Sequence, residues 1–200
     1  MAGPHVAIMP DVRTFACLAF LLTGCLVGDP TPLDPGADPA PQDPSPDPQD
    51  PPPTGTASVR ITATTTTKGD QFAPANVVAV WIEDSAGTFV KTIDRWSAVR
   101  TQYLLEWNTA AGPGDVDSVS GASRTNHTTP LSIQWKLKGA DQVEVPDGTY
   151  TIRMESTESN ATSPADCNEA TFTFVKGAAP QSQTGLSNGG FTNVSIDFTP

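Results

Sequence analysis

The chain has 200 residues, and its 11 Lys and Arg against 22 Asp and Glu give a formal net charge of −11. Contacts to phosphates need clustered Lys and Arg, so an acidic chain without a basic run predicts no nucleic-acid partner. Three Cys exclude a disulfide-dense miniprotein. Two His leave little material for a His-rich metal centre, and we expect no metal.

Residues 1–24 are typical of a secretory signal. Arg13 precedes a short apolar run over residues 15–22, which is followed by two small residues and Cys25. The run is too short for a membrane-spanning helix, which needs about 20 apolar residues. The segment Leu-Thr-Gly-Cys at 22–25 resembles the lipobox of bacterial lipoproteins. That resemblance implies cleavage before Cys25 and attachment of a diacylglycerol to its sulfur.

Two alternatives stay open at this end of the chain. Met9 instead of Met1 is a candidate start, and an ordinary signal peptide with an incidental Cys is the alternative to a lipoprotein signal. Leu26, where many inner-membrane lipoproteins carry Asp, implies sorting to the outer membrane, facing the periplasm or the cell surface. We therefore expect a cell-envelope protein that meets the membrane through its lipid anchor.

Residues 25–56 are expected to form a disordered linker. The window 28–56 holds eleven Pro, and residues 29–50 hold six Asp and no basic residue. Proline fixes φ, holds its predecessor extended and offers no donor, while like charges repel. The segment therefore predicts an extended spacer between the membrane and a folded domain over residues 57–200.

The folded domain is predicted to be all-β. Short runs alternate apolar and polar residues and are separated by Gly, Pro, Asn and Asp, as in a β-sandwich of about seven strands. The apolar positions are Val59, Ile61 and Ala63; Val78, Val80 and Ile82; Phe89 to Ile93; Leu131, Ile133, Trp135 and Leu137; Tyr150, Ile152 and Met154; Phe172 and Phe174; and Val194, Ile196 and Phe198. One short helix is expected over residues 97–107, with Ser97 as its N-cap.

Several segments carry a family resemblance. They are Val78-Ala-Val-Trp-Ile-Glu-Asp84 with Phe89-Val-Lys-Thr92, then Arg95-Trp96, Tyr103-Leu104 and Trp107, then Asp117 to Ser123, and Val145-Pro-Asp-Gly-Thr-Tyr-Thr-Ile152. Their order and spacing over residues 58–157 resemble the DUF2271 family of predicted periplasmic proteins. The strand with Trp135 and the segment 146–150 also resemble the immunoglobulin-like module of the flagellar hook-capping protein. Both resemblances imply an immunoglobulin-like fold and an envelope location, and neither implies a reaction.

One motif has a chemical interpretation. Asp117-Ser-Val-Ser120-Gly121-Ala122-Ser123 is similar to the motif at which a flavin transferase attaches FMN. The resemblance implies that the Ser123 hydroxyl would take the phosphate as a phosphoester. Small residues at 121 and 122 leave the hydroxyl accessible, and Arg124 is placed to pair with a phosphate. The alternative is a surface loop in which Asp and Ser bond nearby backbone N–H groups.

The remaining candidates have simpler interpretations. His127 is expected to be a solvated loop residue, and Cys167 an unpaired, partly buried thiol. The four Trp residues are expected to pack in the core. Five acidic residues offer oxygens for Ca²⁺ without EF-hand spacing, so surface charge is the preferred interpretation; they are Asp70, Glu83, Asp84, Asp115 and Asp117.

Two functions of different class follow. The first is a noncatalytic lipoprotein that presents an immunoglobulin-like domain to bind or scaffold an envelope protein partner. The alternative is an extracytosolic redox carrier with FMN covalently attached at Ser123. The sequence contains no Gly-x-Ser-x-Gly elbow or phosphate-binding loop, so we expect no catalytic residues.

Overall fold

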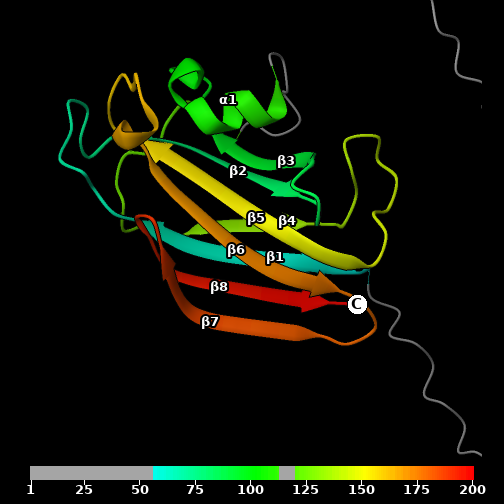
Figure 1. Cartoon of the computed structure of the whole chain (residues 1–200). Helices are drawn as coiled ribbons and strands as arrows, with labels where there is room; N and C mark the ends of the chain where they lie inside the picture. Colours follow the sequence, from blue (N-terminus) through cyan, green and yellow to red (C-terminus); the bar gives the residue numbers. More distant parts are fainter. Residues whose placement is uncertain (1–55, 113–119) are drawn as a thin grey trace, which may run out of the picture. The chain divides into compact units, whose positions relative to one another are not determined.

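Two four-stranded antiparallel sheets pack face to face in the described part of the chain (Figure 1). The computed structural model describes residues 56–112 and 120–200. These residues form eight strands and a single α-helix, which confirms the predicted all-β sandwich with one short helix. The predicted signal, Cys25 and almost all of the predicted linker lie outside the described residues.

The first sheet has the order β4-β1-β8-β7. Its strands are β1 (Ser58–Thr65), β4 (Leu131–Trp135), β7 (Gln181–Asn188) and β8 (Phe191–Thr199). Ile61 on β1 pairs with Ile133 on β4 and with Ile196 on β8. Because neighbouring side chains in a strand point to opposite faces, this register brings the apolar positions of all three strands to one face.

The second sheet has the order β3-β2-β5-β6. Its strands are β2 (Val77–Glu83), β3 (Phe89–Trp96), β5 (Gly148–Thr157) and β6 (Asn168–Lys176). Ile82 on β2 pairs with Ile152 on β5, which in turn pairs with Phe172 on β6. This apolar row faces the first sheet.

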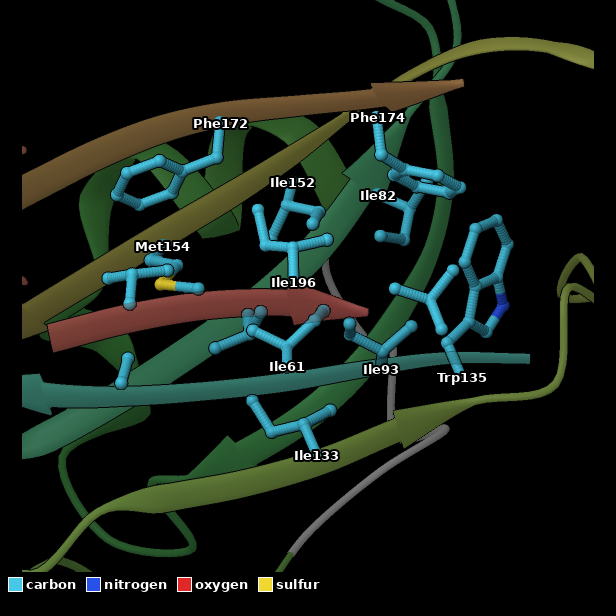
Figure 2. Close-up of a cluster of buried hydrophobic side chains, with 14 of the residues drawn as sticks. Ile61, Ile82, Ile93, Ile133, Trp135, Ile152, Met154, Phe172, Phe174 and Ile196 are labelled. Atoms are coloured by element: carbon cyan, nitrogen blue, oxygen red, sulfur yellow. The ribbon is translucent and has the colours of Figure 1, made fainter. Parts of the chain in front are cut away.

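The main core fills the space between the sheets. Figure 2 shows isoleucine, phenylalanine and methionine side chains from both sheets pointing toward one another. Trp135 lies at one end of this core and meets Phe174 edge to face, with 6.1 Å between the ring centroids. Its indole nitrogen donates to the Lys138 carbonyl oxygen at 2.8 Å. The Trp135 side chain is thus fixed by packing and by a hydrogen bond.

A second, smaller core covers the other face of the second sheet. Val77, Ala79 and Trp81 of β2 pack there against Leu104 and Trp107. Trp107 belongs to helix α1 (Leu105–Ala111), which lies over β2 and β3 (Figure 1). Because both of its faces are covered, β2 is a nearly continuous apolar run and not an alternating one.

The predicted helix start at Ser97 is wrong. A 3₁₀ turn, η1 (Thr101–Tyr103), precedes α1, and neither has a side-chain cap from its own N-cap residue. The carboxylate of Glu155 on β5 instead accepts the first backbone N–H groups of α1, which we describe below. A second 3₁₀ turn, η2 (Pro164–Asp166), lies between β5 and β6.

Sequence alternation identified seven of the eight strands and missed β7. The β7 segment Gln-Ser-Gln-Thr-Gly-Leu-Ser-Asn contains a single large apolar residue and is mostly exposed. Its pairing with β8 is set by backbone hydrogen bonds and not by an apolar face. Within residues 56–112 and 120–200, none of the helices has the length and apolar character needed to cross a membrane.

Candidate functional site

The described part of the predicted FMN motif forms backbone hydrogen bonds near the end of β3 and just before the start of β2. The Ser120 N–H donates to the Arg95 carbonyl at 2.7 Å, and the Ala98 N–H donates to the Gly121 carbonyl at 3.1 Å. One step later, Arg124 and Asn76 exchange two backbone hydrogen bonds of 2.8 and 3.0 Å. Asp117 lies outside the described residues. Backbone hydrogen bonds therefore hold the chain in place on both sides of Ser123.

Ser123 is half-buried and lines a cavity of about 230 Å³ together with Trp96, Arg124 and Asn126. The Arg124 guanidinium lies over the Trp96 ring, with 5.5 Å between its central carbon and the ring centroid. It donates to the Thr129 carbonyl, and burial lowers the pKa of Arg124. Arg124 makes no ion pair with any described residue.

Ala122 and Ser120, which precede Ser123 in the motif, are more exposed than Ser123. Ala122 is exposed, and the exposed Ser120 hydroxyl donates to the Asp94 carboxylate. Burial is the largest influence on that carboxylate and raises the pKa of Asp94, while the bond from Ser120 lowers it. The motif thus combines an accessible stretch at 120–122 with Ser123, which lines a cavity.

The prediction that His127 is a solvated loop residue is wrong. His127 is only 9% exposed. Its Nδ1 lies 2.8 Å from the Thr65 hydroxyl, and its Nε2 is bonded to Glu158. Both partners are far away in the sequence, so no local pattern marks this histidine as buried.

Glu158 connects this histidine to the 66–76 loop. Its second carboxylate oxygen accepts the N–H groups of Lys68 at 2.9 Å and Gly69 at 3.0 Å, and the Thr67 hydroxyl at 2.9 Å. Burial raises the pKa of Glu158, but hydrogen bonds from the Thr67 hydroxyl, the Asp70 N–H, His127 and the Lys68 N–H outweigh it and hold the pKa below its ordinary value. The hydroxyl, imidazole and carboxylate belong to buried residues, and their hydrogen bonds stabilise the loop.

Glu155 and Cys167 lie under helix α1. The Glu155 carboxylate accepts the N–H groups of Leu105 at 2.8 Å and Trp107 at 2.9 Å. Burial raises the pKa of Glu155 above its ordinary value even though these bonds lower it. Burial, with the neighbouring Glu155 charge, also raises the pKa of Cys167 to about 12. The thiol is 7% exposed, which confirms the expectation of an unpaired, buried cysteine.

Asp70, Glu83 and Asp84, the described acidic residues considered for Ca²⁺, do not form a cluster, and Asp115 and Asp117 lie outside the described residues. The Asp84 carboxylate accepts the N–H groups of Ala86 and Thr88 within its own turn, each at 2.9 Å. Glu83 accepts the Trp81 indole N–H at 2.9 Å. Across the residues that the structure describes, there is no group of three or more His, Cys, Asp or Glu that could hold a metal ion.

Three of the four Trp residues are buried, as predicted. Trp81 and Trp107 belong to the smaller core, and Trp135 belongs to the main core. Trp96 is half-buried and lines the cavity beside Ser123.

A basic cleft opens where the edge strands β3 and β4 of the two sheets meet. Its volume is about 350 Å³, and it is lined by Lys91, Ile93, Gln134, Trp135, Lys136, Lys138 and Gln142. Three of the five Lys residues of the chain therefore line one cleft, and none of the described residues in its lining is acidic. Amide and ammonium groups surround an apolar floor, which is the composition of a site for an anionic ligand.

The acidic residues of the adjoining loop, residues 141–147, already form ion pairs or hydrogen bonds with other groups. Glu144 and Asp147 both pair with Lys176, at 3.1 and 2.6 Å. Asp141 accepts the Val143 N–H at 3.0 Å. Lys136 and Lys138 are exposed and make no ion pair with any described residue. The positive charge of the cleft is thus not balanced by these neighbours.

This cleft is not among the sites predicted from the sequence. Lys91 comes from β3, whereas Lys136 and Lys138 follow β4, so the fold brings them together. The one local signal is that Lys136 and Lys138 continue the outward positions of an alternating strand whose other side chains are apolar.

The sequence comparisons give a family and no closer relative. The family model DUF2271, described as a predicted periplasmic protein, matches residues 58–186. Searches of the curated proteins and of the solved structures found no match to the chain.

Proposed function

Since the chain belongs to the DUF2271 family of predicted periplasmic proteins, we propose that it is a noncatalytic binding module of the cell envelope. In this proposal Cys25 carries the lipid anchor, and residues 25–56 act as a spacer. The domain over residues 57–200 binds an acidic partner in the basic cleft.

The observation that carries the proposal is that Lys136 and Lys138 lie together at the cleft of an acidic domain, exposed and without an ion pair to any described residue. Residues 57–200 hold ten Lys and Arg against fifteen Asp and Glu, yet three Lys and no carboxylate are among the described residues that line the basic cleft. A cleft that carries charge of one sign and has walls of low dielectric constant focuses the electric field, and it therefore attracts ligands of the opposite charge. The acidic remainder of the domain repels the same ligands, which favours binding at the cleft alone.

The binding test uses poly-L-glutamate and the full chain. We expect Lys136→Gln and Lys138→Gln each to weaken binding about 3-fold, in line with about 0.6 kcal/mol for an exposed charge pair. Lys68→Gln is the matched control, because it removes one exposed positive charge from the 66–76 loop, which is outside the lining of the cleft and follows the end of β1 opposite to the Val59–Trp135 pair. Fluorescence anisotropy measures the affinities. Equal losses for all three variants would mean that only net charge matters and would contradict a site at the cleft.

The anchor has a separate test. We expect Cys25→Ala to leave the precursor unprocessed or to release the domain from membranes. Normal membrane partition and a normal mature mass in this variant would contradict the lipoprotein part of the proposal.

A second candidate function is favoured by the surroundings of Ser123. Ser123 lines a cavity together with Arg124 and Trp96, and the Arg124 guanidinium lies over the Trp96 ring. A guanidinium without an ion pair complements a phosphate, and an indole face complements a flat ring. On this hypothesis the protein is an extracytosolic redox carrier with FMN joined to Ser123 as a phosphoester.

Co-expression with a periplasmic flavin transferase tests this second function. The protein should become yellow and gain the mass of FMN less one water. Ser123→Ala should abolish the gain, whereas Ser123→Thr should keep it, because either hydroxyl forms the ester. A colourless and unmodified protein would remove this candidate and leave the binding module in place.

A further inference from the structure

The edge strands on the two sides of the sandwich differ in whether side chains cover their backbone. On one side, amide side chains of β7 cover the backbone of edge strand β6. Gln181 accepts the Val175 N–H at 3.2 Å and donates to the Val175 carbonyl at 2.8 Å. Gln183 donates to the Thr173 carbonyl at 2.8 Å. Unpaired strand edges attract foreign strands, and these amides close this edge to them.

On the other side, β4 is an edge strand of the first sheet and pairs with β1 alone. Among the described residues, no side chain covers its outer backbone as Gln181 and Gln183 cover that of β6. The basic cleft runs along this strand, because Gln134, Trp135 and Lys136 belong to its lining. An extended segment that enters the cleft therefore meets both Lys136 and a strand edge that no described side chain covers.

The backbone at the end of β4 is held in a rarely used conformation. Leu137 is fully buried with φ of 56°, and Gln142 has φ of 64°. Such values are unfavourable for residues with a Cβ, and they persist only where the surroundings enforce them. The loop is closed by hydrogen bonds from Gly139 N–H to the Val143 carbonyl at 2.9 Å and from Val145 N–H to the Leu137 carbonyl at 2.9 Å. The burial of Leu137 keeps the flanking Lys136 and Lys138 exposed.

From these observations we infer that the partner of the basic cleft is an extended acidic segment of another protein that adds to β4 as a further strand. This inference rests on the proposed binding function and names its partner class. Backbone hydrogen bonds to β4 supply affinity without sequence preference. Acidic side chains at alternate positions of the added strand meet Lys136 and Lys138, and this gives selectivity.

The test uses peptides that alternate Glu and Thr, with the full chain as the receptor. In an added strand, alternate peptide N–H groups point toward β4 and the others point away. Two N-methylated peptides, one for each alternate set, separate backbone pairing from charge. We expect one N-methylated peptide to lose at least 10-fold in affinity and the other to bind like the parent. Amide hydrogen exchange should slow on residues 131–135 when the parent peptide is bound.

Variants and a second probe distinguish strand addition to β4 from charge-dependent binding at the cleft. The double variant Lys136→Gln/Lys138→Gln should bind the parent peptide about 10-fold more weakly, with an unchanged far-UV spectrum. If both N-methylated peptides bind like the parent and residues 131–135 gain no protection, strand addition is overturned. In that case binding that still depends on Lys136 and Lys138 leaves the proposed function standing. If dextran sulfate binds more tightly than the peptide, a polysaccharide replaces the acidic peptide as partner. If neither probe binds, the inference and the proposed function both fail.

Discussion

The stability of the 66–76 loop depends on the charge of Glu158. This carboxylate is 2% exposed and accepts backbone or hydroxyl hydrogens from Thr67, Lys68 and Gly69 at 2.9 to 3.0 Å. Glu158→Gln keeps the shape of the side chain and removes its charge. Hydrogen bonds to an ionised group are roughly twice as strong as neutral ones, at about 1.5–3 against 0.5–1.5 kcal/mol. The substitution weakens three hydrogen bonds, but a neutral amide is also easier to bury than a carboxylate. The net prediction is a loss of about 2 kcal/mol in the free energy of unfolding.

The sign of the pH dependence follows from the lowered pKa of Glu158 in the folded protein. The unfolded chain takes up the proton first as the pH falls, so the stabilisation by the charge of Glu158 is complete only well above about pH 4.3, the ordinary pKa, and is lost progressively as the pH falls toward the lower pKa of the folded protein. The difference between the wild type and Glu158→Gln should therefore be constant above about pH 5.5 and shrink toward pH 3.

Urea unfolding followed by Trp fluorescence, at several pH values, measures this difference. Glu144→Gln is the matched control, because Glu144 is an exposed carboxylate whose pair with Lys176 predicts a loss of less than about 1 kcal/mol. An equal stability of the wild type and Glu158→Gln at pH 7 would refute the argument. So would a difference that does not change down to pH 3.

Three further predictions concern the core, the covered edge and the thiol. Trp135→Ala should lower the free energy of unfolding by about 3–5 kcal/mol, because it empties one end of the main core; a loss below 1 kcal/mol in urea unfolding would contradict that placement. Gln183→Ala should cost about 1 kcal/mol and increase self-association in sedimentation, since it uncovers the β6 edge, whereas the exposed Thr184→Ala should do neither. The Cys167 thiol, with its pKa raised to about 12, should react with a disulfide reagent at pH 8 at least 100-fold more slowly than glutathione and become reactive in urea; fast reaction of the native protein would contradict its burial.

Much of the sandwich was predictable because alternation reports burial on one face. The runs around Ile61, Ile133 and Ile196 all became strands with their apolar positions in the core. The strand β7 was not predictable in this way. Its pairing and its cover over β6 depend on Gln181 and Gln183 finding partners on a different sheet, and local periodicity contains no such information.

The site was less predictable than the fold for the same physical reason. The N-terminus of α1 is capped by Glu155 from β5, so the local cap candidate Ser97 was misleading. His127 is buried by Thr65 and Glu158, which no spacing rule connects to it. The basic cleft joins Lys91 to a lysine pair from another sheet. Only Ser123 was found by a local motif, and its function stays a prediction.

The most direct test of the binding proposal is an NMR titration of the full chain with poly-L-glutamate. The Trp135 indole N–H is a resolved reporter, because it donates to the carbonyl of Lys138 within the cleft. The proposal predicts that this signal and the amides of residues 91, 134, 136, 138 and 142 shift together and saturate with one affinity. Shifts that centre on Lys68 or Lys176, or an indole signal that does not move, would contradict binding at the basic cleft.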